Sequence, residues 1–429
     1  MISRKTLLKK LKNNDVIIWG ARMTGLGALR YLRSNNINPV CFTDSDKAFS
    51  NKTIKNLPVI SPKNLSHKIK KNKWNPLILV AVSLKEEEIL LMSKLYSLDS
   101  FKFYSFQSSK SPYFTVDILS SCNLKCLSCP HSLKDKSDAP KGSMSLSTAK
   151  NVIDKIKLES PETTHISLYS WGEPLIHPKI DQIVHYAHSK NMAVALSSNL
   201  SINFSDNKLE KLIKSEPDYI KISVSGFYPE AYNTTHQGGD INLVKSNLRK
   251  IHKYILKHKS NTLIDINYHL YRNNNGKNLQ KFKELANELG FILSTTYALV
   301  MPLERVFNKL DGKKDLQTET LEKNLLVDIN EGIRISSQNI PKKSTCPFRE
   351  NQININADLS VPICCVTFNK SKNIVSNNYL DTSLQKISKK KNKISTCKKC
   401  MQNRLPEYNM GYNRDLWEKI ADTKLSLDH

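Results

Sequence analysis

Three cysteines within eight residues constrain this 429-residue chain more than any other feature. Cys122, Cys126 and Cys129 follow the spacing C-x3-C-x2-C, and no fourth cysteine lies nearby. Because iron–sulfur clusters normally take four cysteine ligands, a local set of three leaves one iron for an outside ligand. The alternative is a zinc knuckle without its last ligand. Zinc sites usually combine two separated ligand pairs, whereas the nearest histidine, His131, follows these cysteines at once.

The sequence from Tyr113 to Leu299 alternates between strand-like and helix-like periodicity. Six strands are predicted, at residues 113–119, 165–170, 192–197, 219–225, 262–270 and 291–299. Apolar residues recur at helical spacing between them, at residues 146–156, 180–188, 207–215, 229–258 and 277–289. Alternating strands and helices are typical of a parallel sheet. Such sheets bind ligands at the carboxyl ends of their strands.

Polar motifs stand at several of these strand ends. The second strand runs into Ser170-Trp171-Gly172-Glu173-Pro174, and the third ends at Asn199. The fourth strand contains Ser223, and the fifth leads to Arg272. An ordinary strand-end turn explains each motif singly. Chance is a poor explanation for all of them in this order after the cysteine loop.

Together, these motifs resemble those of the radical S-adenosylmethionine (SAM) enzymes. The cysteine loop resembles the cluster loop of that family, and residues 171–174 resemble its Gly-Gly-Glu-Pro turn, with Trp171 in place of the first glycine. The resemblance implies an α/β fold with an open, partial (β/α)6 barrel at residues 111–305. It also implies a 4Fe-4S cluster on Cys122, Cys126 and Cys129, whose open iron binds SAM.

The same resemblance suggests the cofactor contacts and the reaction type. Glu173 and the backbone of Gly172 are expected to hold the amino group of SAM. The candidates for its ribose and carboxylate are Asn199, Ser223 and Arg272. In the family, one electron from the cluster cleaves SAM and releases a 5′-deoxyadenosyl radical, which takes hydrogen from a substrate carbon. The resemblance also implies that a donor such as flavodoxin or ferredoxin supplies this electron to the cluster.

A second set of cysteines lies in residues 306–429, which resemble the SPASM/twitch extension that follows many radical SAM cores. Nine cysteines, less the three of the loop and less Cys41, leave five. Two fully cysteine-ligated clusters would need eight ligands, so one auxiliary 4Fe-4S cluster is expected. Its predicted ligands are Cys346, Cys364, Cys397 and Cys400. The choice between Cys364 and the adjacent Cys365 stays open, and structural zinc on four thiolates is the alternative.

Residues 1–110 resemble a Rossmann-like domain. A strand at Val16–Trp19 runs into a glycine-containing turn and a helix, and a second strand ends at Asp44. Arg22 occupies the middle glycine position of G-x-G-x-x-G, where a backbone normally approaches a pyrophosphate. Ordinary NAD binding is therefore in doubt. Two interpretations remain open: Arg22 meets a phosphate, with Asp44 at the ribose position, or the domain serves docking or oligomerisation.

The composition of the chain limits the classes of partner that it is expected to bind. The net charge is +26, but lysine and asparagine are spread along the whole chain, and the densest run, residues 386–393, has no interleaved aromatic residue. Nucleic acid is therefore not the expected partner, whereas attraction for a phosphorylated or acidic substrate is compatible with the charge. Clustered, odd-numbered cysteines indicate a reducing cytoplasm. No apolar run of about eighteen residues predicts a membrane span.

The predicted protein is a radical SAM oxidoreductase, either a dehydrogenase or an epimerase. Its expected substrate is a sugar, a nucleotide-sugar or a similar small polar molecule, because Rossmann-like domains accompany enzymes of sugar pathways. Two alternatives are retained. One is a maturase of a ribosomal peptide, and the other is a non-enzymatic iron–sulfur or nucleic-acid-binding protein.

Overall fold

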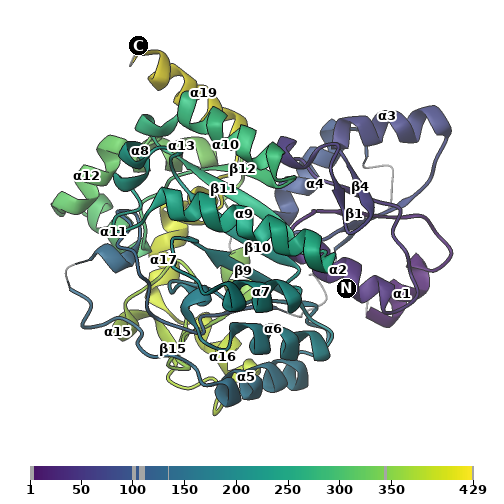
Figure 1. Cartoon of the computed structure of the whole chain (residues 1–429), viewed down its shortest axis with the longest axis horizontal. Coiled ribbons are helices and arrows are strands. Elements are labelled where there is room, and N and C mark those ends of the chain that lie inside the picture. The colour runs from purple at the N-terminus through teal and green to yellow at the C-terminus, as the bar shows by residue number, and fades with distance from the viewer. Residues whose placement is uncertain (1–3, 99–102, 106–111, 134, 343–344, 428–429) are drawn as a thin grey trace.

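Two separate parallel sheets organise the chain. The computed structural model describes residues 4–98, 103–105, 112–133, 135–342 and 345–427. A small N-terminal α/β unit lies beside a larger α/β unit that continues to the C-terminus (Figure 1). The sequence predicts the boundary between these two units at residues 110–111, and residues 106–111 lie outside the described residues.

The N-terminal sheet has the strand order β3-β4-β2-β1-β5-β6. Its strands are β1 (Val16–Trp19), β2 (Cys41–Thr43), β3 (Thr53–Ile54), β4 (Leu57–Ile60), β5 (Leu77–Val80) and β6 (Phe103–Ser105). All neighbouring pairs are parallel except β3 with β4. Strand β1 is apolar and buried throughout, as a central parallel strand with both faces covered should be. The helices are α1 (Arg4–Leu11), α2 (Met23–Arg33), α3 (Pro62–Asn72) and α4 (Glu86–Leu95).

The larger sheet has seven strands in the order β12-β11-β10-β9-β8-β7-β13, and every neighbouring pair is parallel. Six of them confirm the predicted strands: β7 (Tyr113–Val116), β8 (His165–Ser167), β9 (Ala193–Ser198), β10 (Tyr219–Val224), β11 (Leu263–Leu270) and β12 (Ile292–Tyr297). Their spatial order follows the chain order. This arrangement is an α/β parallel sheet of the partial-barrel kind.

Helices connect these strands, and one prediction about them was wrong. They are α5 (Leu146–Glu159), α6 (Ile180–Ser189), α7 (Asp206–Lys214), α8 (Pro229–Asn233), α9 (Ile241–His258) and α10 (Lys277–Glu288). The single helix expected at 229–258 is therefore two, α8 and α9. Gly238 has a positive φ of 85°, which a helix does not allow. The Asp240 side chain then accepts from the backbone N–H of Asn242 and caps α9.

The C-terminal segment packs against the partial barrel and shares its sheet. Strand β13 (Gln352–Ile355) pairs with β7, whereas β14 (Val361–Pro362) pairs antiparallel with β15 (Ile374–Ser376). The helices are α11 (Leu303–Leu310), α12 (Leu316–Asn324), α13 (Ile329–Ser337), α14 (Pro347–Glu350), α15 (Lys370–Asn373), α16 (Leu384–Lys391), α17 (Ser395–Gln402), α18 (Leu405–Met410) and α19 (Arg414–Leu427). Among the described residues, no helix combines the length and the apolar character that crossing a membrane requires.

Helix α2 joins the two units. It lies between the N-terminal sheet and strands β8 and β9 of the larger sheet (Figure 1). A methyl group on Gly27 would approach the Cβ of His165 to 2.9 Å, so only glycine allows this close packing. Ala195, Tyr219 and Ile292, near the amino ends of their strands, belong to the same apolar cluster as the N-terminal core. The N-terminal unit therefore covers the amino-end mouth of the partial barrel, which we call the barrel floor.

Candidate functional site

The cysteine loop follows β7, at the carboxyl edge of the larger sheet, and its backbone is fixed by a neighbouring segment. The Lys125 N–H donates to the Gln237 carbonyl at 2.9 Å, and the Leu127 N–H donates to that of Thr235 at 3.1 Å. Within the loop, the Cys129 N–H donates to the Cys126 carbonyl at 2.9 Å. The interruption between α8 and α9 thus supplies the acceptors that hold the loop in place.

Two side chains from distant parts of the chain also hold the loop. Arg305, on α11, is only 3% exposed, and its Nη1 donates to the carbonyls of Leu127 at 3.0 Å and Met301 at 3.1 Å. The Tyr271 hydroxyl donates to Ser128 Oγ at 3.3 Å. Sequence reasoning missed both residues, because no local motif marks a contact that spans more than 140 positions.

The three thiols lie in surroundings that keep them protonated without a metal. Burial raises the pKa of Cys122 to about 11 and that of Cys129 to about 12, and burial also raises the pKa of Cys126. Cys122 Sγ accepts from the Leu124 N–H at 3.4 Å and lies 3.6 Å from the Asn199 Nδ2 donor. Since cluster ligands must be thiolates, binding of iron has to displace these protons.

Glu173 is buried directly beside this loop. Its backbone N–H donates to the Ser121 carbonyl at 2.9 Å, and its carboxylate accepts from the N–H groups of Asn199 at 2.8 Å and Leu175 at 3.0 Å. Burial raises its pKa to about 7 despite these hydrogen bonds. The structure therefore brings together Cys122, Glu173 and Asn199, which the sequence assigned to one site. A carboxylate so placed is suited to an amino group of a ligand.

Asp117, which sequence reasoning missed, fixes the turn that carries Glu173. Its carboxylate accepts from the backbone N–H groups of Trp171 at 3.3 Å and Gly172 at 3.2 Å, and burial raises its pKa to about 7. The Gly172 N–H is therefore engaged within the protein. A Cβ at Gly172 would lie 1.5 Å from the Leu119 carbonyl oxygen. Gly172 is thus required for the turn to lie against the chain that follows β7.

The other two predicted cofactor residues lie on neighbouring elements. Ser223 is near the carboxyl end of β10, in register with Asn267 of β11, and is partly exposed. Arg272 opens the short helix η4 (Arg272–Asn274) after β11 and is exposed. Both sit at the sheet edge that carries the cysteine loop, and their contact with a cofactor stays a prediction.

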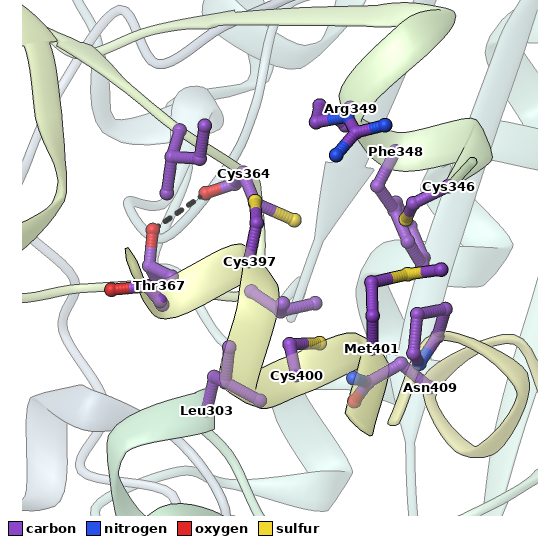
Figure 2. A pocket seen from close by; sticks show the side chains of 14 residues that line it. Leu303, Cys346, Phe348, Arg349, Cys364, Thr367, Cys397, Cys400, Met401 and Asn409 are labelled. Carbon is purple, nitrogen blue, oxygen red and sulfur yellow. Dashed lines mark hydrogen bonds between the residues drawn. The ribbon is translucent and has the colours of Figure 1, made fainter. Parts of the chain in front are cut away.

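Four of the C-terminal cysteines line one cavity (Figure 2). Its free volume is about 20 Å³, and its cysteines are Cys346, Cys364, Cys397 and Cys400. They come from the start of α14, the loop after β14, and α17. Burial raises the pKa of Cys346 to about 12 and raises that of Cys400 as well. Cys365 is not among the lining residues.

The donor chemistry of the two cysteine sets fits iron–sulfur clusters, which cysteine thiolates hold. Each set presents sulfur ligands alone. Within the described residues, no three His, Cys, Asp or Glu side chains converge on a single metal ion, so the fit to a cluster rests on the donor chemistry of the cysteines. Phe348, Ile363 and Leu303 line the C-terminal cavity beside the cysteines. Such apolar walls limit water around a cluster.

A short path connects the two cysteine sets. The Trp171 indole Nε1 donates to the Thr367 carbonyl at 3.2 Å, and Thr367 Oγ1 donates to the Cys364 carbonyl at 2.8 Å. Thr367 itself lines the C-terminal cavity (Figure 2). Trp171, which replaces the first glycine of the turn, therefore connects the Glu173 turn to the C-terminal segment.

The N-terminal glycine turn faces the barrel floor. Arg22 Nη2 lies 2.5 Å from Asp46 Oδ2, and its Nε lies 3.3 Å from Asp265 Oδ2 on β11. Asp44 accepts the Ala21 N–H at 2.9 Å. The next residue, Met23, receives a hydrogen bond from Ser167 of β8 at its sulfur. The guanidinium, which one of the two open interpretations placed on a phosphate, is thus held by two carboxylates.

Comparison with known proteins agrees with this site. A family model described as the Radical SAM superfamily matches residues 116–286. The AdoMet-dependent heme synthase of Methanosarcina barkeri (strain Fusaro / DSM 804) is 25% identical over 186 residues, which are 43% of this chain and 49% of that protein. The chain thus spans about half the length of this curated relative.

Two solved structures that match part of this chain have S-adenosylmethionine bound. Native anSMEcpe with bound AdoMet is 17% identical, with a TM-score of 0.44 over 69% of this chain and 88% of that one. Streptococcus suis SuiB bound to S-adenosylmethionine is 13% identical, with a TM-score of 0.40 over 66% and 71%.

The match to the radical SAM family therefore covers residues 116–286, which contain the three-cysteine loop and the Glu173 turn. That family implies a 4Fe-4S cluster and SAM.

Proposed function

We propose that this radical SAM enzyme oxidises or epimerises a small polar substrate and holds one auxiliary 4Fe-4S cluster in its C-terminal segment. The observation that carries the proposal is the pairing of two separate cysteine sites. One is the three-cysteine loop beside Glu173 and Asn199. The other is the four-cysteine cavity that Thr367 links to the Glu173 turn.

In this proposal Cys122, Cys126 and Cys129 hold the catalytic cluster, and Glu173 receives the amino group of SAM. When bound, the cluster and SAM together supply a 5′-deoxyadenosyl radical, which takes a hydrogen atom from substrate carbon. Asn199 fixes the Glu173 carboxylate through its backbone N–H and lies against Cys122 through its side chain. The turn is rigid, because Asp117 binds its backbone from below. The protein thus contributes position and exclusion of water.

The auxiliary site favours oxidation as the outcome. A dehydrogenase must dispose of one further electron and one proton after the hydrogen atom has left, and a cluster in the four-cysteine cavity is a one-electron acceptor. An epimerase instead returns a hydrogen atom to the substrate and needs a donor for it. The substrate class is proposed as small and polar, because the interior faces of β10 and β11 carry Ser223, Asn267 and His269.

Anaerobic reconstitution with iron and sulfide tests the proposal. The wild type is expected to hold about eight irons per chain, and Cys364→Ala about four, since one of two four-iron sites is lost. Cys365→Ala is the matched control and should keep about eight. Four irons together with one zinc in the wild type would contradict the auxiliary cluster.

A second measurement tests the radical chemistry. The reduced, reconstituted enzyme should cleave SAM to methionine and 5′-deoxyadenosine, and Cys126→Ala should abolish this cleavage. Cys41→Ala removes a buried thiol of the N-terminal unit and should leave it unchanged. Equal cleavage by both variants would contradict the cysteine assignment. If a short peptide accelerates SAM cleavage and no small molecule does, the maturase alternative is favoured.

A further inference from the structure

A column of polar side chains runs along the interior face of β11. Successive residues of a strand point to opposite faces, and Ile264, Ile266 and Tyr268 are buried in the apolar core. Asp265, Asn267 and His269 therefore share the interior face. His269 is the penultimate residue of the strand and is partly exposed, although β11 lies between β10 and β12. Its exposure therefore faces the barrel interior, at the edge that carries the cysteine loop.

The direction of the hydrogen bonds in this column follows from its lowest member. An ionised carboxylate only accepts, so Ser294 Oγ, 2.6 Å from Asp265 Oδ1, is the donor of that bond. The Ser294 oxygen then accepts from Asn267 Nδ2 at 3.0 Å. The same Nδ2 also donates to Thr296 Oγ1 at 2.9 Å. The Asn267 amide is therefore fixed, with Oδ1 on its other side.

This orientation determines the protonation of His269. Asn267 Oδ1 lies 3.1 Å from His269 Nε2. Because an amide oxygen only accepts, the hydrogen sits on Nε2, and the neutral ring keeps the lone pair on Nδ1. Burial, with smaller contributions from the nearby His236 and Lys221, lowers the pKa of His269 to about 3, so the ring is neutral at physiological pH.

The N-terminal unit anchors the lower end of the column. Asp265 is fully buried and receives hydrogen bonds from the Tyr219 hydroxyl at 2.6 Å and from Arg22 Nε at 3.3 Å. Arg22 comes from the glycine turn on the barrel floor. The Arg22 guanidinium forms an ion pair with the Asp265 carboxylate, and a carboxylate that only accepts hydrogen bonds gives the column its direction.

The upper end of the column lies near the cysteine loop. The ring of His269 is 6.1 Å from that of His236, centroid to centroid. His236 belongs to the short segment whose Thr235 and Gln237 carbonyls hold the backbone of the loop. A substrate positioned for hydrogen abstraction beside the loop would thus have the ring of His269 as a neighbour.

We propose that His269 Nδ1 is the proton acceptor for substrate oxidation, with its tautomer set by the column that Arg22 anchors. This inference rests on the proposed function. The carbon of a secondary alcohol would lose a hydrogen atom to the radical that SAM, once bound at the loop of Cys122, Cys126 and Cys129, would supply. The O–H bond breaks and its proton goes to Nδ1. The C=O bond forms, and the remaining electron would go to the one-electron acceptor of the proposed function, the auxiliary cluster that Cys346, Cys364, Cys397 and Cys400 would hold.

Nitrogen-15 NMR of histidine-labelled full-length protein, recorded before iron is added, tests the tautomer directly. His269 is assigned by loss of its signals in His269→Gln. At pH 7 it should show a protonated Nε2 and an unprotonated Nδ1, and it should remain neutral at pH 6. Asp265→Asn can donate to Ser294, so in that variant His269 should lose its single tautomer. A protonated Nδ1 in the wild type, or no change in Asp265→Asn, would overturn the inference.

Enzyme turnover gives a second, independent readout. Small-molecule fractions of a cell extract are added to the reconstituted enzyme, and release of 5′-deoxyadenosine is measured. His269→Gln should retain the slow release of 5′-deoxyadenosine that occurs without substrate. Its substrate-stimulated rate of release should be at least about tenfold lower than that of the wild type. His252→Gln, which alters a histidine on α9 that bonds the Leu289 carbonyl, should match the wild type in both. Equal stimulated rates in all three would overturn the inference, whereas no release by any would contradict the proposed function itself.

Discussion

The contact between Arg22 and Asp265 should make a measurable contribution to stability, because it joins the two units across the barrel floor. Asp265 is fully buried. Arg22→Met would leave it with only the hydroxyl donors of Tyr219 and Ser294. Breaking a buried ion pair from one side typically costs about 3–5 kcal/mol. The Arg22 side chain is 34% exposed, so we expect the lower end, about 3 kcal/mol.

A double-mutant cycle isolates the pair. Asp265→Asn removes the buried charge and should cost about 1–2 kcal/mol through weaker hydrogen bonds. In the double variant no unpaired charge remains, so its cost should be about 2 kcal/mol less than the sum of the two single costs. Urea unfolding of the metal-free protein, followed by tryptophan fluorescence, measures all four free energies. Costs that add within about 0.5 kcal/mol would refute a direct interaction across the floor.

Three further predictions concern the site itself. Gly172→Ala forces a Cβ to within 1.5 Å of a backbone oxygen and should lower the unfolding free energy by about 3 kcal/mol or more. Gly411→Ala, where the backbone is in the left-handed helical region and nothing lies within 4 Å, should cost only that strain, about 1 kcal/mol. Burial raises the pKa of Glu173 from 4.5 to about 7, so its contribution to stability is present below pH 4.5 and is lost as the pH rises through 7. Between pH 4.5 and 8, the free energy of unfolding of the metal-free wild type should therefore fall by about 3 kcal/mol relative to that of Glu173→Gln. Urea unfolding measures this difference. Parallel pH dependences of the two free energies would contradict the raised pKa. Arg305→Met should reduce the iron retained after gel filtration by as much as half, whereas Lys309→Met on the same helix should not; equal iron in both would show that the loop does not depend on Arg305.

The sequence predicted those features that are local. The cysteine spacing, the strand periodicity and the Glu173 turn depend on a few adjacent residues, and the strand order then brings Cys122, Glu173 and Asn199 to one edge of the sheet. The parallel sheet was predictable for the same reason, since its strands pair in chain order. The break between α8 and α9 was also written locally, in Gly238 and Gly239, but the apolar spacing on both sides concealed it.

Contacts between distant segments were not predictable in this way. Asp117 and Arg305 act on backbone groups far along the chain, and no motif marks their partners. Arg22 sits at a position that in related turns approaches phosphate, so its sequence context suggested an anion. The tertiary packing determines which anion Arg22 binds, and here its partners are the carboxylates of Asp46 and Asp265.

The most direct test of the central claim is an electron paramagnetic resonance measurement on a variant that retains only the three-cysteine loop. Alanine replaces the four cavity cysteines, which are Cys346, Cys364, Cys397 and Cys400. After reconstitution and one-electron reduction, this variant should show the spectrum of one four-iron cluster. Addition of SAM should change that spectrum, because the open iron left by Cys122, Cys126 and Cys129 binds the cofactor. An unchanged spectrum at saturating SAM would contradict the account.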